Sequence, residues 1–233
     1  MNANRFLICG ALLAGINAAA SDKASLSDSP MTSDQIEVYR VFLDSYTNGS
    51  KAPHLNLAKR TSALKLSKEM SEGGCLRGIS LDATAYSNSV VHEFDSKTPL
   101  RENITIVDPE EQNKAVKEND PSRTMRQGTP VNRAVANAFA MGLLTLSEVA
   151  FDKTHQYAVM SFSFVCGGLC GHGTTLVFDK RNGHWKELKR DCGGWISQKG
   201  KSQIDFSTWL LFMPATTYSP THFRVQYNRP SGA

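Results

Sequence analysis

Residues 156–189 read QYAVMSFSFVCGGLCGHGTTLVFDKRNGHWKELK, and this stretch decides the fold. It contains three strand-like segments, residues 156–165, 174–179 and 184–189, which are rich in Val, Phe and Thr and are separated by short turns. Asn182-Gly183 is the residue pair that a two-residue hairpin with positive φ requires. Leu144 to Phe151 adds a fourth segment, so the sequence predicts an antiparallel β-meander over about residues 144–190.

Amphipathic helices are predicted on the N-terminal side of this meander. Thr32 or Ser33 can cap a helix whose apolar residues recur at steps of three and four up to Tyr46. Thr129-Pro130 predicts another helix, with threonine as the cap and proline at the first helical position, which stops at Gly142. Packing such helices on the apolar face of the meander gives an α+β fold.

The residues between these two helices give weaker signals. We expect an extended segment within residues 54–66 and a short strand at Ile104–Val107. A helix is predicted to begin at Pro109, because proline is tolerated in a first turn. The charged segment Lys117 to Gly128, which contains Pro121, is interpreted as a surface loop.

The N-terminus predicts export. Arg5 precedes the apolar run Phe6 to Ile16, and Ala18-Ala19-Ala20 offers a cleavage site, so residues 1–20 are interpreted as a signal peptide that is removed. A retained membrane anchor is disfavoured because the run is shorter than the roughly 18 apolar residues of a spanning helix. Lipid attachment at Cys9 is a further alternative. We therefore predict a secreted or periplasmic protein with no transmembrane segment in the mature chain.

The mature chain is expected to form one domain. Residues 21–30 are polar and should form a flexible leader, residues 31–213 a single α+β domain, and residues 214–233 a poorly ordered tail. The net charge of the full chain is only +4, with Lys and Arg scattered among acidic residues. This distribution lacks the basic patch of a nucleic-acid-binding protein, so no nucleic-acid partner is predicted.

Cleavage would leave four cysteines, Cys75, Cys166, Cys170 and Cys192. An even number in an oxidising compartment favours two disulfides over free thiols. Three connectivities are open, and the preferred one joins Cys166 to Cys170 and Cys75 to Cys192. The first bond would pin a hairpin tip, and the second would close a long loop, worth about 4–5 kcal/mol in the chain-entropy model.

The segment Leu144 to Ser197 resembles a group of uncharacterised exported bacterial proteins. The resemblance rests on SEVAFD, on the loop Cys166-Gly167-Gly168-Leu169-Cys170-Gly171-His172-Gly173, and on Cys192-Gly193-Gly194-Trp195. It implies a secreted bacterial protein and no known activity. The strands are also similar to NTF2-like and cystatin-like sheets, a likeness of fold that transfers no function.

Enzyme chemistry has little support in the sequence. A zinc site would use side chains of the right type, Cys166, Cys170, His172, His184 and Cys192. Disulfides explain these cysteines better in an exported chain, so no metal and no cofactor are predicted. No Gly-x-Ser-x-Gly elbow, Walker motif or dinucleotide motif occurs. The glycines of the cysteine loop are interpreted as turn residues that need positive φ.

We therefore expect a non-enzymatic binding or cell-envelope-associated module with an envelope or extracellular ligand. Its candidate ligand face is aromatic and combines four side chains, Tyr157, His172, Trp185 and Trp195. The alternative is a hydrolase that acts on cell-wall or extracellular material, with a site at the sheet rim near His172.

Overall fold

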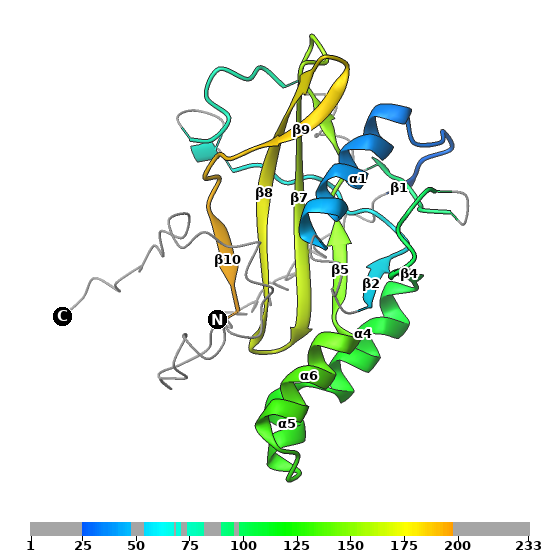
Figure 1. Cartoon of the computed structure of the whole chain (residues 1–233), viewed down its shortest axis with the longest axis vertical. Helices are drawn as coiled ribbons and strands as arrows, with labels where there is room; N and C mark the ends of the chain where they lie inside the picture. Colours follow the sequence, from blue (N-terminus) through cyan, green and yellow to red (C-terminus); the bar gives the residue numbers. More distant parts are fainter. Residues whose placement is uncertain are drawn as a thin grey trace, which may run out of the picture.

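The computed structural model describes residues 25–47, 54–67, 69–70, 74–81, 90–95 and 98–197. Within these residues the chain is α+β, with helices packed on a mixed sheet (Figure 1). The α+β prediction is therefore confirmed. The signal peptide predicted at residues 1–20 and the tail predicted at residues 214–233 lie outside the described residues.

The longest strands form the predicted hairpin. β7 (Tyr157–Gly167) and β8 (Cys170–Arg181) are antiparallel, from Tyr157 opposite Asp179 to Gly167 opposite Cys170. β9 (His184–Leu188) returns along the second half of β8, which completes the predicted antiparallel segment. β8 begins four residues earlier than expected, because Cys170 to Gly173 continue the ladder and do not belong to the loop.

The strand predicted from Leu144 to Phe151 is interrupted. β5 (Leu143–Leu146) and β6 (Ala150–Phe151) both pair antiparallel with β7. Between them, Glu148 donates its backbone N–H to the carbonyl of Ser62 instead of to β7. This change of backbone partner explains the break in the strand.

Parallel strands extend the sheet beyond the meander. β2 (Leu55–Ala58) lies between β5 and β4 (Ile104–Val107) and is parallel to both. β10 (Gly194–Ile196) pairs with the first half of β8 at the other end of the sheet. The strand order is thus β10-β8-β7-β5-β2-β4, and the meander is only part of the sheet.

A separate two-stranded sheet lies next to the start of α1. β1 (Ser25–Leu26) pairs in parallel with β3 (Val90–Val91), and the Ser27 N–H donates to the Val91 carbonyl at 2.8 Å. The segment predicted as a flexible leader, residues 21–30, therefore contains a short strand. Its polar composition does not prevent this pairing, since the hydrogen bonds come from the backbone.

Helix α1 (Ser33–Tyr46) covers one face of the sheet, called here the α1 face (Figure 1). Thr32 caps it, as the sequence predicts, and Gln35 completes a capping box by accepting from the Thr32 N–H at 2.8 Å. Its buried apolar side chains are spaced by one helical turn and pack on the aromatic and aliphatic residues of the sheet: Val38, Tyr39, Phe42 and Leu43.

Three further helices lie beside the end of the sheet where β7 turns into β8 (Figure 1): α4 (Pro109–Glu118), α5 (Pro121–Arg126) and α6 (Val131–Met141). The surface-loop prediction for residues 117–128 is wrong over α5. Asp120 accepts hydrogen bonds from the N–H groups of Ser122 and Arg123, which starts a helix with proline in its first turn. The predicted cap of α6 is also wrong by one residue, since Pro130 itself is the cap.

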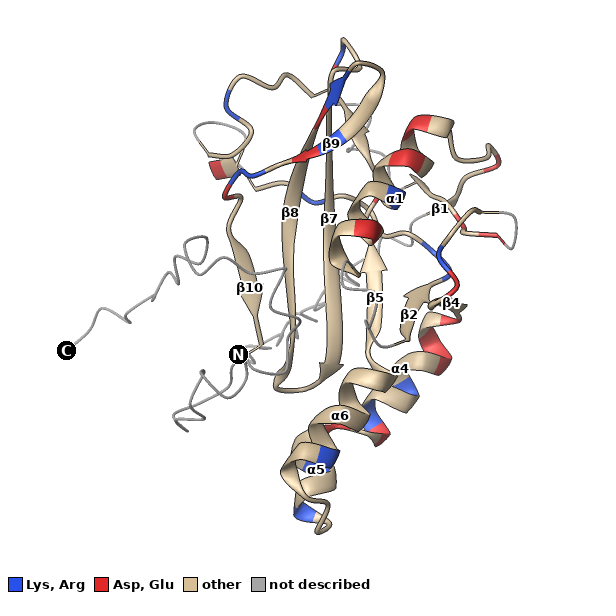
Figure 2. Cartoon of the chain, viewed as in Figure 1, with Lys and Arg blue, Asp and Glu red and all other residues tan. Residues whose placement is uncertain are grey.

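The other side of the sheet, called here the opposite face, has two separate apolar clusters. Val116 of α4 packs near Ala58 and Leu143. Residues around Cys75 and Leu76 pack near Val159 and Val177. Charged residues are sparse on the long central strands and frequent on the helices (Figure 2).

The turn between β8 and β9 gives a direct test of the hairpin. Asn182 and Gly183 have φ values of 51° and 82°, as the pair Asn-Gly predicts. Gly183→Val should lower the free energy of unfolding by about 1–2 kcal/mol, because a β-branched residue is strained at positive φ. Gly183→Asn should retain most of the stability, since asparagine tolerates this conformation. Urea unfolding that shows the two variants to be equally stable would contradict the assignment.

Candidate functional site

Two disulfides join all four cysteines of the described chain. Cys75 is bonded to Cys192 and Cys166 to Cys170, with Cα–Cα distances of 4.9 and 5.0 Å. This is the connectivity that the sequence analysis preferred among three. The bonded sulfurs offer no thiolate for zinc or for nucleophilic attack. In the described ranges, no group of three or more His, Cys, Asp or Glu side chains is placed to hold a metal ion.

The four aromatic residues of the predicted ligand face do not lie together. Alternate residues of a strand point to opposite faces of a sheet, so the register decides the side of each. His172 is opposite Phe164 and Trp185 is opposite Lys180, which places both on the α1 face. Tyr157 pairs with Asp179 and Trp195 with Gly173, which places these two on the opposite face. The prediction of one shared aromatic face is therefore wrong.

His172 is buried under α1. Its side chain lies among the rings of Tyr46, Phe162 and Phe164, and only 5% of the residue is exposed. The Tyr46 hydroxyl lies 3.2 Å from Nε2 of His172. Burial lowers the pKa of His172 to about 4, so the ring is neutral at neutral pH. This placement does not match the open sheet rim that the hydrolase alternative requires.

Trp185 anchors α1 to the sheet. The residue is buried, and the Lys180 Nζ lies 5.3 Å from the centre of its ring. The same Nζ bonds both carboxylate oxygens of Asp34 on α1, at 2.9 and 3.0 Å. Burial opposes ionisation of Asp34, but its hydrogen bonds outweigh burial and lower its pKa. Trp185 is therefore part of the packing between helix and sheet and is not available to a ligand.

Trp195 is the exposed member of the set, with 43% of the residue accessible. Its indole lies across Gly171 and Gly173 of β8. A Cβ at Gly171 would lie 3.3 Å from the six-membered ring, and a Cβ at Gly173 would lie 2.6 Å from Nε1. We call this arrangement, Trp195 over Gly171 and Gly173, the Trp195 shelf.

The shelf also explains the glycines of the cysteine loop. Gly167 has a positive φ of 149°, as predicted for a turn glycine. That interpretation is wrong for Gly171 and Gly173, which lie in the β8 ladder and are not among the glycines with positive φ. A Cβ would also lie 2.9 Å from the Phe164 carbonyl oxygen at Gly171 and 2.4 Å from the Phe162 carbonyl oxygen at Gly173, so both the β7 backbone and the indole leave space only for glycine.

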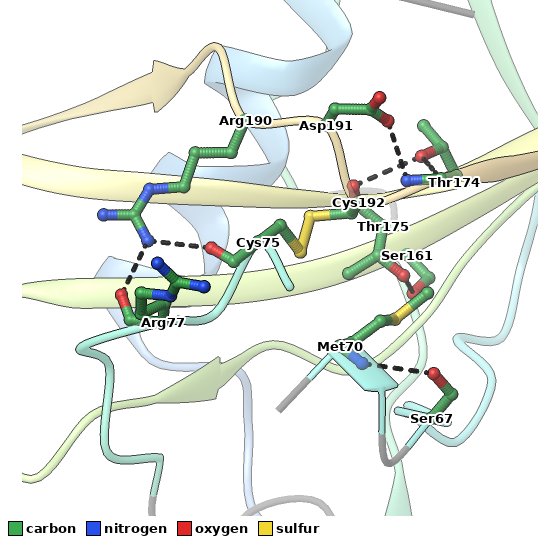
Figure 3. Close-up of a disulfide and its surroundings, with 11 residues drawn as sticks. Ser67, Met70, Cys75, Arg77, Ser161, Thr174, Thr175, Arg190, Asp191 and Cys192 are labelled. Carbon is green, nitrogen blue, oxygen red and sulfur yellow. Dashed lines mark hydrogen bonds between the residues drawn. A yellow bond between two sulfur atoms is a disulfide. The ribbon is translucent and has the colours of Figure 1, made fainter. Parts of the chain in front are cut away.

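Several contacts hold Trp195 in place. β10 is only three residues long and begins two residues after Cys192, whose disulfide to Cys75 is drawn in Figure 3. On the N-terminal side of β10, the Thr174 hydroxyl donates a hydrogen bond to the Gly193 carbonyl. On the C-terminal side of β10, the Ser197 N–H donates to the Gly171 carbonyl at 2.9 Å, and the Ser197 hydroxyl donates to the Gly168 carbonyl at 2.8 Å. Both sides of Trp195 are thus fixed to the β7–β8 hairpin.

The hairpin tip beside the shelf is itself anchored. The carboxylate of Asp120, the cap of α5, accepts from the Gly168 N–H at 2.5 Å. Burial alone would raise the pKa of Asp120, but this bond and those from Arg123 and Ser122 lower it. The charged Asp120 therefore ties α5 to the tip, next to the exposed Leu169.

The structure also contains a buried pair that sequence reasoning missed. His92 places Nδ1 2.8 Å from Oε2 of Glu148, which is 7% exposed. Oε1 of the same carboxylate accepts from the His92 N–H and from the Thr61 hydroxyl. The pair joins segments that are 56 residues apart, and Oε2 of Glu148 also accepts from the side-chain amide of Gln35 at 3.5 Å. We interpret it as a structural tie.

The SEVAFD motif is accounted for by the same region, residues 147–152. Ser147 accepts a hydrogen bond from the Tyr39 hydroxyl at 2.9 Å through its carbonyl, and Glu148 forms the tie to His92. Asp152 accepts from the N–H groups of Gln156 and Tyr157 at 2.7 and 2.6 Å, which closes the turn into β7. The motif therefore has a structural explanation in this chain.

Comparison with protein-family models, with curated proteins and with solved structures gives no match. The class that the fold and disulfides define is therefore a broad one: an α+β protein whose two disulfides suggest an extracellular or otherwise oxidising environment. No helix in the described part of the chain is long and apolar enough to cross a bilayer.

The buried His172 predicts a specific pH dependence. The unfolded chain binds a proton at this imidazole below about pH 6.5, whereas the folded protein does so only near pH 4. Above about pH 6.5 the imidazole is neutral in both states, so it makes the free energy of unfolding no more dependent on pH. As the pH falls from about 6.5 to about 4, protonation of His172 in the unfolded chain alone lowers the free energy of unfolding by roughly 3 kcal/mol in total.

Urea unfolding at about pH 7 and about pH 4.5 measures this effect. His172→Phe, which keeps a ring among Phe162 and Phe164, should show a smaller loss of stability at the lower pH than the parent. A variant that loses as much stability as the parent would show that His172 is not the group responsible.

Proposed function

We propose that this chain is an exported, disulfide-stabilised binding module of the cell envelope or extracellular space, and that it binds its ligand through the Trp195 shelf. The observation that carries this proposal is an indole that is 43% exposed yet fixed over two glycines. An aromatic ring held in one place offers a large contact area at a small cost in conformational entropy.

Export is supported by two features. The disulfides suggest an oxidising compartment, where such bonds form and persist. The sequence before the described domain, Arg5 followed by the apolar run Phe6 to Ile16, has the pattern of a signal peptide.

The surroundings of Trp195 favour a ligand with both apolar and polar groups. Gly171 and Gly173 have no side chains that would screen the indole from below, and Leu169 is 46% exposed at the adjacent hairpin tip. Ser163 pairs with Gly173 on the same face and is partly accessible. A glycan fits this surface, because its C–H faces stack on an aromatic ring and its hydroxyl groups bond to serine.

Peptidoglycan is the first ligand to test, since it is the main glycan of a bacterial envelope. Sedimentation of the purified mature protein with insoluble peptidoglycan should remove it from solution, and Trp195→Ala should weaken this binding at least tenfold. The matched control is Val131→Ala, which truncates another exposed apolar residue, 65% exposed on α6. It should bind like the parent.

Two results would contradict the proposal. One is a folded Trp195→Ala variant that sediments like the parent, and the other is a parent protein that does not sediment with peptidoglycan at all. Thermal melts should show that both variants are folded; Val131→Ala should match the parent, whereas Trp195→Ala loses the contacts of its indole with β8 and should melt somewhat lower.

A further inference from the structure

An exposed basic surface lies at one end of the molecule, on α5 and the start of α6. Residues 121–147 contain three arginines, Arg123, Arg126 and Arg133, and no lysine, aspartate or glutamate. Their net charge is therefore +3, compared with +4 for the whole chain. Figure 1 shows α5 and the turn after it beyond the end of the sheet, at the lower end of the longest axis. We call the surface formed by Arg123, Arg126, Val131 and Arg133 the arginine corner.

The arginines of the corner present their charge to solvent. All three residues are exposed, and none of their guanidinium groups forms an ion pair or a hydrogen bond with a residue of the described ranges. Arg123 and Arg126 are three residues apart on α5, so their side chains leave the helix on the same side. The carboxylate of Asp120, which precedes α5, is occupied by hydrogen bonds from three backbone N–H groups. The positive charge of the corner is therefore available to a partner of opposite charge.

Val131 adds an apolar side chain to this corner. It is the first residue of α6 and is 65% exposed, more than any other large apolar residue of the described chain. Pro130 before it is exposed as well, and Arg133 follows two residues later. A soluble polyanion would satisfy the arginines but would leave the valine in water. The headgroup layer of an anionic bilayer offers phosphates to arginine and, directly below them, an apolar interior to valine.

We infer that the arginine corner docks on an anionic phospholipid bilayer. The attraction between arginine and such a membrane is electrostatic and is screened by salt, whereas the burial of valine is not. Three arginines and one valine support a weak, reversible attachment to the surface and no insertion across it. The inference does not depend on the Trp195 shelf, which belongs to β10 and β8.

Sedimentation of the full mature protein with sucrose-loaded vesicles tests the inference. At about 0.1 M salt, vesicles of phosphatidylcholine with about one-third phosphatidylglycerol should bind the protein at least tenfold more strongly than vesicles of phosphatidylcholine alone. At about 0.5 M salt most of this difference should disappear, because the charges are then screened.

Substitutions in the corner should weaken binding to the anionic vesicles. The variant that combines Arg123→Gln, Arg126→Gln and Arg133→Gln should bind at least tenfold more weakly, because it removes all three charges. Val131→Ala should bind at least twofold more weakly, because less apolar surface enters the bilayer. Both variants change exposed side chains, so thermal melts should show that they are folded.

Two controls separate the corner from other parts of the protein. A matched variant replaces three exposed lysines on other elements of the chain: Lys153→Gln, Lys186→Gln and Lys189→Gln. It changes the net charge by the same amount and should bind within about twofold of the parent, because these charges lie away from the corner. Trp195→Ala, which should lose binding to peptidoglycan, should bind vesicles like the parent, so the two proposals can fail independently.

The inference is overturned if the parent does not bind the anionic vesicles, if it binds neutral vesicles equally well, or if the triple arginine variant binds like the parent. An equal loss in the triple lysine variant would also overturn it, because binding would then follow net charge alone. Parent-like binding by Val131→Ala would leave only the charge, which a soluble polyanion such as polyphosphate satisfies equally, and would overturn it too.

Discussion

The Cys75–Cys192 disulfide is the covalent constraint on which the candidate binding site depends. It joins residues separated by 117 positions and holds the link between β9 and β10 against the segment around Leu76. Closing so long a loop is worth about 4–5 kcal/mol in the chain-entropy model. β10 is too short to be stable alone, so this bond, together with the hydrogen bonds of Thr174 and Ser197, keeps Trp195 over its glycines.

The two faces of the β7–β8 hairpin have different roles. On the α1 face, large aromatic side chains meet a helix and exclude water, and His172 is held neutral among them. The opposite face has small residues at this place, Gly171, Gly173 and Ser163, which leave room for one exposed indole. The α1 face of these two strands is thus closed by packing, and the proposed recognition site lies on the opposite face.

The sequence predicts those features that depend on neighbouring residues. The cap at Thr32, the strand at Ile104–Val107 and the turn at Asn182-Gly183 each have a local signal, and each is confirmed. The parallel pairing of β2 and the tie between His92 and Glu148 join distant segments, so no local pattern indicates them. The division of the aromatic residues between two faces follows from the registers of β7, β9 and β10 with β8, which no local pattern fixes.

Peptide mapping of the exported, mature protein under non-reducing conditions tests whether the Cys75–Cys192 disulfide holds β10 in place. We expect two linked peptide pairs, one that joins Cys75 to Cys192 and one that joins Cys166 to Cys170, with no free thiol. A link from Cys75 to either cysteine of the hairpin tip, or a free Cys192, would contradict it. A free Cys192 would leave β10 without covalent support, and a link from Cys75 to the hairpin tip would remove the bond between β10 and the segment around Leu76.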